Sequence, residues 1–310
     1  MNASGRVVAA VDGTEGSAGA LRYAREEAVR WGFLLSIVHV SPTYVPLAPM
    51  LPYVPDDLTS AGEAILRDAA AAVSGPAGPE VETRLLSNGR VAAIVEAARD
   101  ADLLVLGRET KRGVDRMLFG TTTAGTAECA ATAAHSAVPA VVVPGDWRPG
   151  SSEGVVVAGL RSHHGADELL RTAFEAASAR GAVLRIVHAW SLPDPYADRV
   201  EERTHAARWL TAARTHIDRL LDPWRERFPD VVVEIVVVHD QPARTLIRQT
   251  EHADLVVLVR QPVAVLPGRR LGSTARAVLA HAANPVEVLP ATSGTANADG
   301  AEADRTKVTS

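Results

Sequence analysis

The residues best suited to chemistry in this chain lie at the start of a predicted helix. A polar stretch that starts at Arg108 leads to one glycine and three threonines: Gly120, Thr121, Thr122 and Thr123. The N-terminus of a helix presents unpaired backbone N–H groups and the positive end of the helix dipole, and both suit a phosphate. A glycine there lets the backbone approach a ligand closely, and the hydroxyl groups add hydrogen-bond donors. The segment therefore predicts an anion-binding helix start, with an ordinary threonine N-cap as the alternative.

Further candidates lie at the ends of predicted strands. Asp12 and Gly13 directly follow one strand, Val40 ends a second and Gly107 ends a third. In an open α/β sheet, ligands bind beyond the carboxyl ends of the strands. These residues are therefore expected to surround one binding site, with Arg108 beside them.

Several other chemical motifs are absent. The chain has no GxxxxGK[ST] sequence, which excludes a P-loop. Gly13, Gly16 and Gly19 are spaced by three, so the GxGxxG dinucleotide fingerprint is also missing. No HExxH or Cys/His spacing indicates a metal site, and the scattered histidines define no Ser-His-Asp set. We therefore predict no catalytic residue and no protein metal site.

The chain reads as two copies of one unit. Residues 100–109, DADLLVLGRE, match residues 252–261, HADLVVLVRQ, at six of ten positions with an offset of 152. Residues 34–40, LLSIVHV, match residues 183–189, VLRIVHA, at an offset of 149. We expect four segments, namely a domain over 1–144, a Pro/Gly/Ser-rich linker over 145–154, a second domain over 155–290 and a disordered tail over 291–310.

Within each copy, short Val- and Leu-rich runs alternate with helical patterns. This alternation predicts an α/β fold of two tandem open-sheet domains, each a five-stranded parallel sheet with helices on both faces. The predicted strands are 6–11, 34–40, 80–86, 103–107 and 140–143, then 155–159, 183–190, 231–238, 255–259 and 286–289. The predicted helices of the first copy are 16–31, 58–74, 91–101 and 122–136. In the second copy, residues 195–228 predict an amphipathic cover helix, bent or ended at Pro223.

Composition excludes several classes of protein. Apolar residues form 47% and aromatic residues 4% of the 310 residues, which suits buried strands rich in Val, Leu and Ile. A net charge of −5 without a basic stripe argues against nucleic acid as a partner. The single cysteine, Cys129, excludes an internal disulfide and is expected to be a small buried residue. With no signal-peptide pattern and no apolar run long enough to span a membrane, we expect a cytoplasmic protein without a membrane partner.

This combination of motifs resembles the universal stress protein family. The resemblance rests on AAVDGTEGS after the first strand, ADLLVLGRE at the fourth strand and the glycine loop that follows, and it covers both copies from about residue 5 to 290. The ATP-binding pattern of that family is Gly, two residues, Gly, nine residues, then Gly-Ser/Thr. It falls here on Gly107, Thr110, Gly120 and Thr121. The chain therefore looks like a tandem universal stress protein.

The resemblance implies a role for each matching residue and ATP with Mg²⁺ as the cofactor. Asp12 and Val40 would contact the adenine and ribose, and Gly107 would flank the phosphates. Gly120 and Thr121 would hold the phosphates, and the threonine at position 123 matches a second hydroxyl position of the pattern.

Two departures from the pattern leave open the phosphate register, that is, which Gly-Thr pair would hold the phosphates. Thr110 replaces a glycine, and threonine avoids positive φ angles. In addition, the first copy has six more residues than the second in or before its last helix. Gly125 and Thr126 are therefore an alternative to the pair at 120–121, although the spacing from Gly107 favours the earlier pair.

The second copy keeps less of the pattern. Arg161 stands where the first copy has Asp12, and Val259 stands where it has Gly107. The Gly-Ser pair at 272–273 is retained. A cation in place of a carboxylate, and a side chain where the backbone should approach a ligand, predict weak or no nucleotide binding in this copy.

The leading expectation is an adenine-nucleotide-binding stress protein whose first copy uses ATP as a sensor or switch more than as a turnover enzyme. An ATP-independent scaffold for an unknown protein partner and a slow ATPase or autophosphorylating protein are the alternatives. The resemblance also implies an intramolecular pseudo-dimer through the last strands, 140–143 and 286–289, whose edges would benefit from cover. Homodimerisation of whole chains is left open.

Overall fold

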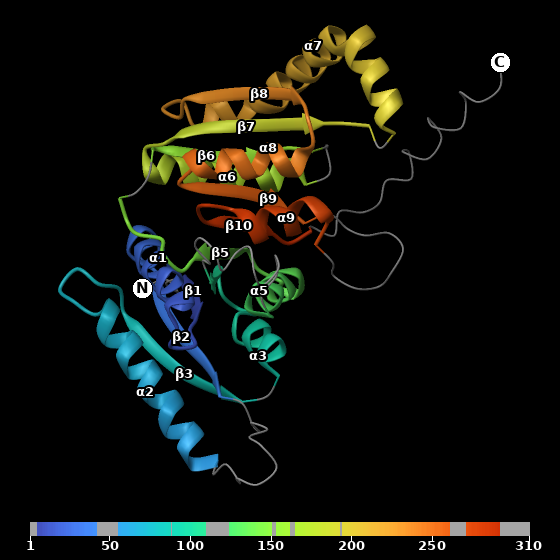
Figure 1. Cartoon of the computed structure of the whole chain (residues 1–310). Helices are drawn as coiled ribbons and strands as arrows, with labels where there is room; N and C mark the ends of the chain where they lie inside the picture. Colours follow the sequence, from blue (N-terminus) through green and yellow to red (C-terminus); the bar gives the residue numbers. More distant parts are fainter. Residues whose placement is uncertain are drawn as a thin grey trace.

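Two copies of a parallel α/β unit share one continuous sheet in the computed structural model (Figure 1). The structure describes residues 5–41, 55–87, 89–109, 124–150, 153–161, 165–192, 194–260 and 271–291. The first copy contains β1 (Arg6–Ala10), α1 (Glu15–Trp31), β2 (Leu34–Ser41), α2 (Pro55–Val73), β3 (Val81–Ser87), α3 (Arg90–Ala97), β4 (Leu103–Arg108), α5 (Ala124–His135) and β5 (Ala140–Pro144). The second contains β6 (Val155–Gly159), α6 (Ala166–Arg180), β7 (Val183–Trp190), α7 (Pro195–Arg227), β8 (Val233–His239), α8 (Pro242–Gln249), the 3-10 turn η1 (Thr250–His252), β9 (Leu255–Val259), α9 (Ser273–His281) and β10 (Val286–Leu289).

The predicted elements are confirmed, with differences at their ends. Every predicted strand is present, and the observed bounds differ from the predicted ones by at most two residues. The α7 helix does not end at Pro223 but continues to Arg227. In Figure 1 this helix projects past the sheet and changes direction along its length.

The sheet order is β3-β2-β1-β4-β5-β10-β9-β6-β7-β8. Neighbouring strands within each copy are parallel, but β5 and β10 pair antiparallel, with Val141 opposite Glu287. The two five-stranded sheets expected from the sequence are therefore halves of one ten-stranded sheet. The pairing gives each last strand a hydrogen-bonded neighbour on the side that would otherwise be an open edge.

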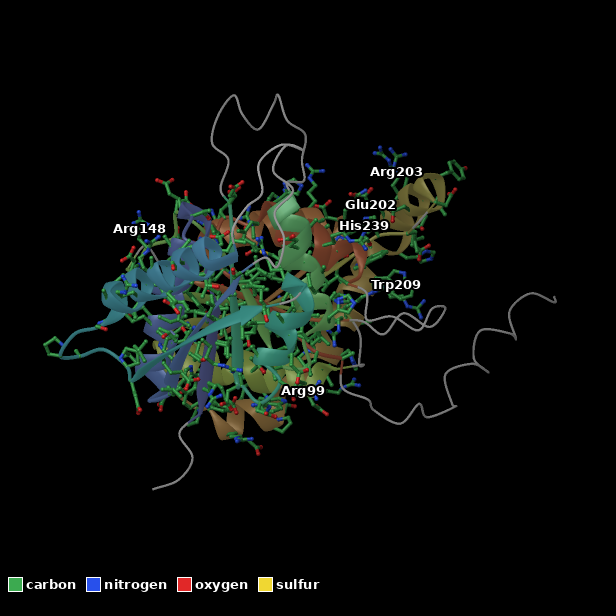
Figure 2. All side chains as sticks on the ribbon, turned by 90° about the horizontal axis from the view of Figure 1, so that it is seen from below. Arg99, Arg148, Glu202, Arg203, Trp209 and His239 are labelled. Carbon is green, nitrogen blue, oxygen red and sulfur yellow. The ribbon has the colours of Figure 1, made fainter. Side chains whose placement is uncertain are left out.

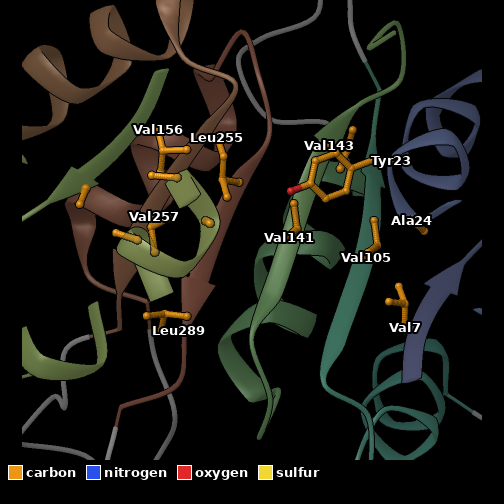
Figure 3. Close-up of a cluster of buried hydrophobic side chains, with 14 of the residues drawn as sticks. Val7, Tyr23, Ala24, Val105, Val141, Val143, Val156, Leu255, Val257 and Leu289 are labelled. Atoms are coloured by element: carbon orange, nitrogen blue, oxygen red, sulfur yellow. The ribbon is translucent and has the colours of Figure 1, made fainter. Parts of the chain in front are cut away.

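Alternating strand residues face two hydrophobic cores. Val7 and Ala9 of β1 belong to a core that also contains residues of α1, α2, α6 and α7, whereas Val8 belongs to a core that contains residues of α3, α5, α8 and α9. Both cores extend across the junction: Figure 3 shows Val141 of β5 and Leu289 of β10 in the same cluster. Burial on both faces explains why these strands read as continuous Val- and Leu-rich runs.

Two arginines at equivalent positions of the repeat cross the junction on one face of the sheet. Arg108, the last residue of β4, donates to the carbonyl oxygens of Ala280 and Ala282 at the end of α9. Arg260, directly after β9, donates to three carbonyls at the end of α5: those of Ala133, Ala134 and Ser136, at 3.2, 2.6 and 3.2 Å. The last carbonyls of a helix lack intrahelical donors and lie at the negative end of its dipole. Each buried guanidinium therefore caps the last helix of the other copy.

The opposite face of the junction holds a buried polar cluster, which we call the junction cluster: Tyr23, Glu27, Arg180 and Glu287. Arg180 of α6 donates to Glu27 Oε1 at 2.5 Å and to the Tyr23 hydroxyl at 3.1 Å, both on α1. Burial raises the pKa of Glu287 to about 7, and the nearby Arg180 offsets this only in part. The two copies are thus joined by polar contacts on both faces of the sheet.

Removing the Arg260 side chain is expected to weaken the junction. Arg260→Ala removes a buried donor from three helix-end carbonyls, so the free energy of unfolding should fall by about 2–3 kcal/mol. Urea denaturation followed by circular dichroism measures this change. Arg99→Ala is the matched control, because the Arg99–Glu96 ion pair is exposed (Figure 2). This variant should lower the free energy of unfolding by less than about 1 kcal/mol. Equal losses in the two variants would contradict the anchoring role.

Protonation of Glu287 is expected to make stability depend on pH. Because its pKa is raised from 4.5 to about 7 by folding, the native protein binds more protons than the unfolded chain between these values. This stabilisation is fully present below pH 4.5 and is lost as the pH rises through about 7. Glu287→Gln, which stays neutral, should flatten the pH dependence of the free energy of unfolding in urea titrations. An unchanged slope, matching that of the exposed control Glu96→Gln, would refute this assignment.

Candidate functional site

The carboxyl ends of β1, β2 and β4 surround a cavity of about 90 Å³ in the first copy. Three of the predicted residues, each following or ending a different strand, line it together: Asp12, Val40 and Gly107. The β1–β2 and β1–β4 registers place these strand ends side by side. The structure thus brings these three predicted residues together at one edge of the sheet.

Asp12 is held as a carboxylate by its own turn. The backbone N–H and the hydroxyl of Thr14 donate to Asp12 Oδ1 at 3.0 and 2.7 Å. Partial burial raises the pKa of Asp12, but the hydrogen bonds from Thr14 outweigh it, and the net pKa lies below its ordinary value. A charged acceptor is therefore available at the cavity at neutral pH.

Two glycines at this edge have structural roles that do not involve a ligand. Gly13 has a φ of +78°, a conformation that favours glycine, and it is not among the described residues that line the cavity. A Cβ atom on Gly107 would lie 2.3 Å from the carbonyl oxygen of Gly16, so α1 packs directly on β4 at this point. Glycine is therefore required at position 107 for helix–strand packing, whatever it contributes to a ligand.

The prediction for Arg108 requires a correction. Its side chain was expected beside a bound nucleotide, but it is buried across the junction on the last turn of α9. Successive residues of a strand point to opposite faces of the sheet, and the face that receives Arg108 is covered by the helix of the other copy. The repeat indicated that this arginine has a role other than nucleotide binding. Arg260 occupies the equivalent position in the second copy, where the nucleotide pattern is degenerate.

The predicted phosphate-binding residues, Gly120, Thr121, Thr122 and Thr123, lie outside the described residues. The alternative residues Gly125 and Thr126 fall in the first turn of α5, where backbone N–H groups lack intrahelical acceptors. Both registers thus remain predictions.

Sequence reasoning missed several residues that line this cavity. Arg90 of α3 pairs with Glu128 of α5 at 3.0 Å. The Cys129 thiol donates to the Gly107 carbonyl at 2.9 Å. His39 Nδ1 lies 2.8 Å from the Val11 carbonyl. Only the histidine had a sequence signal, because it recurs in both copies of the repeated strand motif.

The equivalent edge of the second copy holds a cavity of about 370 Å³. Arg161 and Val259 line it at the positions of Asp12 and Gly107, as the repeat alignment predicted. His188 Nδ1 lies 2.9 Å from the Leu160 carbonyl, which repeats the contact of His39 in the first copy. The two edges therefore share a framework but differ in the side chains that face the cavity.

The described ranges contain neither a cluster of metal-ligating side chains nor a membrane-spanning helix. Within them, no group of three or more His, Cys, Asp or Glu side chains is placed to hold a metal ion. No helix in these ranges combines the length and hydropathy that crossing a membrane requires.

The fold and the two edge cavities define a duplicated open α/β protein whose copies are fused through their last strands. The sequence profile described as the universal stress protein family matches residues 4–144 and again residues 155–290. The chain belongs to this family, in its tandem form.

Several individual universal stress proteins are similar to this chain in sequence or in fold. The chain is 31% identical over 292 residues to the universal stress protein Rv2005c of Mycobacterium tuberculosis, covering 91% of this chain and 96% of that protein. It is 28% identical over 306 residues to Rv2623 of the same organism, covering 93% and 97%. A crystal structure of a universal stress protein from Archaeoglobus fulgidus has the same fold, with a TM-score of 0.65 at 18% identity over 93% of this chain and 96% of that one.

The Cys129 thiol is expected to react slowly in the folded protein. Burial raises its pKa to about 12, so little thiolate is present at neutral pH. Alkylation by iodoacetamide at pH 8, measured by mass spectrometry, should be more than about tenfold slower than in the urea-unfolded chain. Because this is the single cysteine, every adduct reports on it. Equal rates in the two states would show that the thiol is accessible and ionised.

Proposed function

We propose that the first copy binds ATP together with Mg²⁺ at the carboxyl ends of β1, β2 and β4, and that the bound nucleotide acts as a sensor or switch in a stress response. The observation that carries this proposal is the convergence of Asp12, Val40 and Gly107 on one cavity. These residues come from separate parts of the sequence, and each matches a nucleotide-contacting position in the family pattern.

The charges at this cavity fit a metal–nucleotide complex better than a bare triphosphate. Asp12 and Glu128 both line the cavity, and Arg90 offsets only one of these carboxylates. Bound Mg²⁺ would reduce the negative charge of the phosphates, and the Asp12 carboxylate can accept hydrogen bonds from the ribose hydroxyls. In this proposal the phosphates are held either by Gly120 and Thr121 or by Gly125 and Thr126.

A binding role is better supported than turnover. Asp12 already accepts two hydrogen bonds from Thr14, and Glu128 is paired with Arg90. A general base for water attack needs an acceptor within hydrogen-bond reach of that water. Because the lowered pKa of Asp12 makes its carboxylate a weak base and Glu128 is paired with Arg90, we expect phosphate release from ATP no faster than in buffer.

Isothermal titration with Mg-ATP tests the proposal. Wild-type protein should bind, and Asp12→Asn should bind at least about tenfold more weakly, because a charged acceptor becomes a neutral one. The amide oxygen can still accept the Thr14 hydrogen bonds, so the turn should persist. Asp100→Asn, at an exposed position, is the matched control and should bind like wild type. Absence of heat with the wild-type protein would refute nucleotide binding and favour the scaffold alternative.

The same titration distinguishes the two phosphate registers. Gly120→Val should abolish binding if the backbone at 120–121 approaches the phosphates, and Gly125→Val should then have a smaller effect. The reverse order would assign the phosphates to Gly125 and Thr126.

A further inference from the structure

The cavity of the second copy is large enough for a small molecule. Its volume of about 370 Å³ falls within the range of roughly 300–1,000 Å³ that is usual for ligand pockets. The ends of β6, β7 and β9 form its base, and the starts of α6, α8 and α9 form its sides. The described residues of this copy thus enclose a cavity where the family pattern for ATP is degenerate.

The charge of this cavity is opposite to that of the first. No Asp or Glu is among the described residues that line it, whereas Arg161 is. Within the described parts of the chain, the Arg161 side chain has no hydrogen-bond or ion-pair partner. The hydroxyl residues Ser273 and Thr274, at the start of α9, also line the cavity. These groups favour an anionic ligand, because a guanidinium and hydroxyl donors can bind a carboxylate.

One wall of the cavity is aromatic. Trp190 lines it, and the equivalent residue of the first copy is Ser41. The Trp190 ring lies 4.2 Å from the His239 ring and 6.0 Å from the Trp209 ring, measured between centroids. His239 Nε2 is in turn 2.7 Å from Asp198 Oδ1 on α7, which fixes the imidazole. Figure 2 shows Trp209 and His239 on the same side of the molecule.

This aromatic wall is therefore held in place before any ligand arrives. An ordered aromatic surface suits a planar ring, because little side-chain freedom remains to be lost on binding.

Two positions of the family's ATP pattern carry different side chains in this copy. Val259 replaces Gly107, and its Cγ1 lies only 2.9 Å from where a Cβ on Gly165 would be. The space between β9 and the start of α6 is thus filled by a side chain. In addition, Arg161 replaces the carboxylate that would accept hydrogen bonds from ribose. These two replacements favour a ligand other than a nucleotide in this cavity.

We propose that the second copy binds a small aromatic carboxylate in this cavity, with its ring against Trp190 and its carboxylate at Arg161. The two copies then bind ligands of different classes on one framework. This inference does not depend on ATP binding in the first copy, since the cavities share no lining residue.

Isothermal titration of the full chain with benzoate and indole-3-carboxylate tests the proposal. At least one should bind, and the corresponding amides, benzamide and indole-3-carboxamide, should bind more than tenfold more weakly because they lack the charge. Acetate, which lacks the ring, should also bind more than tenfold more weakly. Failure of both aromatic carboxylates to bind, or equal binding of acid and amide, would overturn the proposal.

Variants locate the site. Arg161→Gln changes an exposed residue, so the fold should persist, and the affinity for the aromatic carboxylate should fall more than tenfold. Arg99→Gln, also exposed, should leave it unchanged. Trp190→Leu should weaken binding and remove the ligand-induced change in tryptophan fluorescence. Unchanged affinity in Arg161→Gln would overturn the assignment.

The same reagents separate this proposal from ATP binding. Asp12→Asn should retain aromatic carboxylate binding, and Arg161→Gln should retain any Mg-ATP binding. Competition between Mg-ATP and the aromatic carboxylate for one site would overturn the inference, whereas loss of ATP binding alone would leave it standing.

Discussion

The antiparallel pairing of β5 with β10 is the constraint on which the rest of the structure depends. Each copy ends in a short, Val-rich strand that is buried on both faces, and such a strand cannot leave its backbone N–H and C=O groups unpaired. Pairing the two strands satisfies both edges at once. It also brings α5 and α9 together on one face and α1 and α6 together on the other. The contacts that join the copies follow from this arrangement.

The arginine that caps each neighbouring helix illustrates how duplication and packing act together. Arg108 and Arg260 occupy the same position of the repeated motif. Neither side chain lines the cavity of its own copy, because each binds carbonyl oxygens at the end of the other copy's last helix. Residues of α5 line the first cavity and residues of α9 line the second, so each capped helix also borders the cavity of its own copy.

The two cavities show how one framework supports different chemistry. Both keep the strand order and a histidine bonded to the backbone of the first strand. The first presents carboxylates and a glycine packed against α1, whereas the second presents an arginine, an aromatic ring and a valine. Electrostatic complementarity decides which ligands each can accept, because a like charge in a partly dry cavity is costly. The fold alone defines neither ligand.

The sequence by itself determined the family, the duplication, the strands and the edge of the sheet where Asp12, Val40 and Gly107 meet. These features are encoded locally, by β-branched runs, turn residues and short motifs. Only the tertiary structure decided that the two sheets are one, that Arg108 points across the junction and that position 107 needs glycine because α1 lies against it. It also decided that His239 and Trp209 pack against Trp190, which lines the second cavity, although the three residues come from different elements. Such contacts join residues far apart in sequence, and their distances depend on how helices pack on strands, which no local pattern specifies.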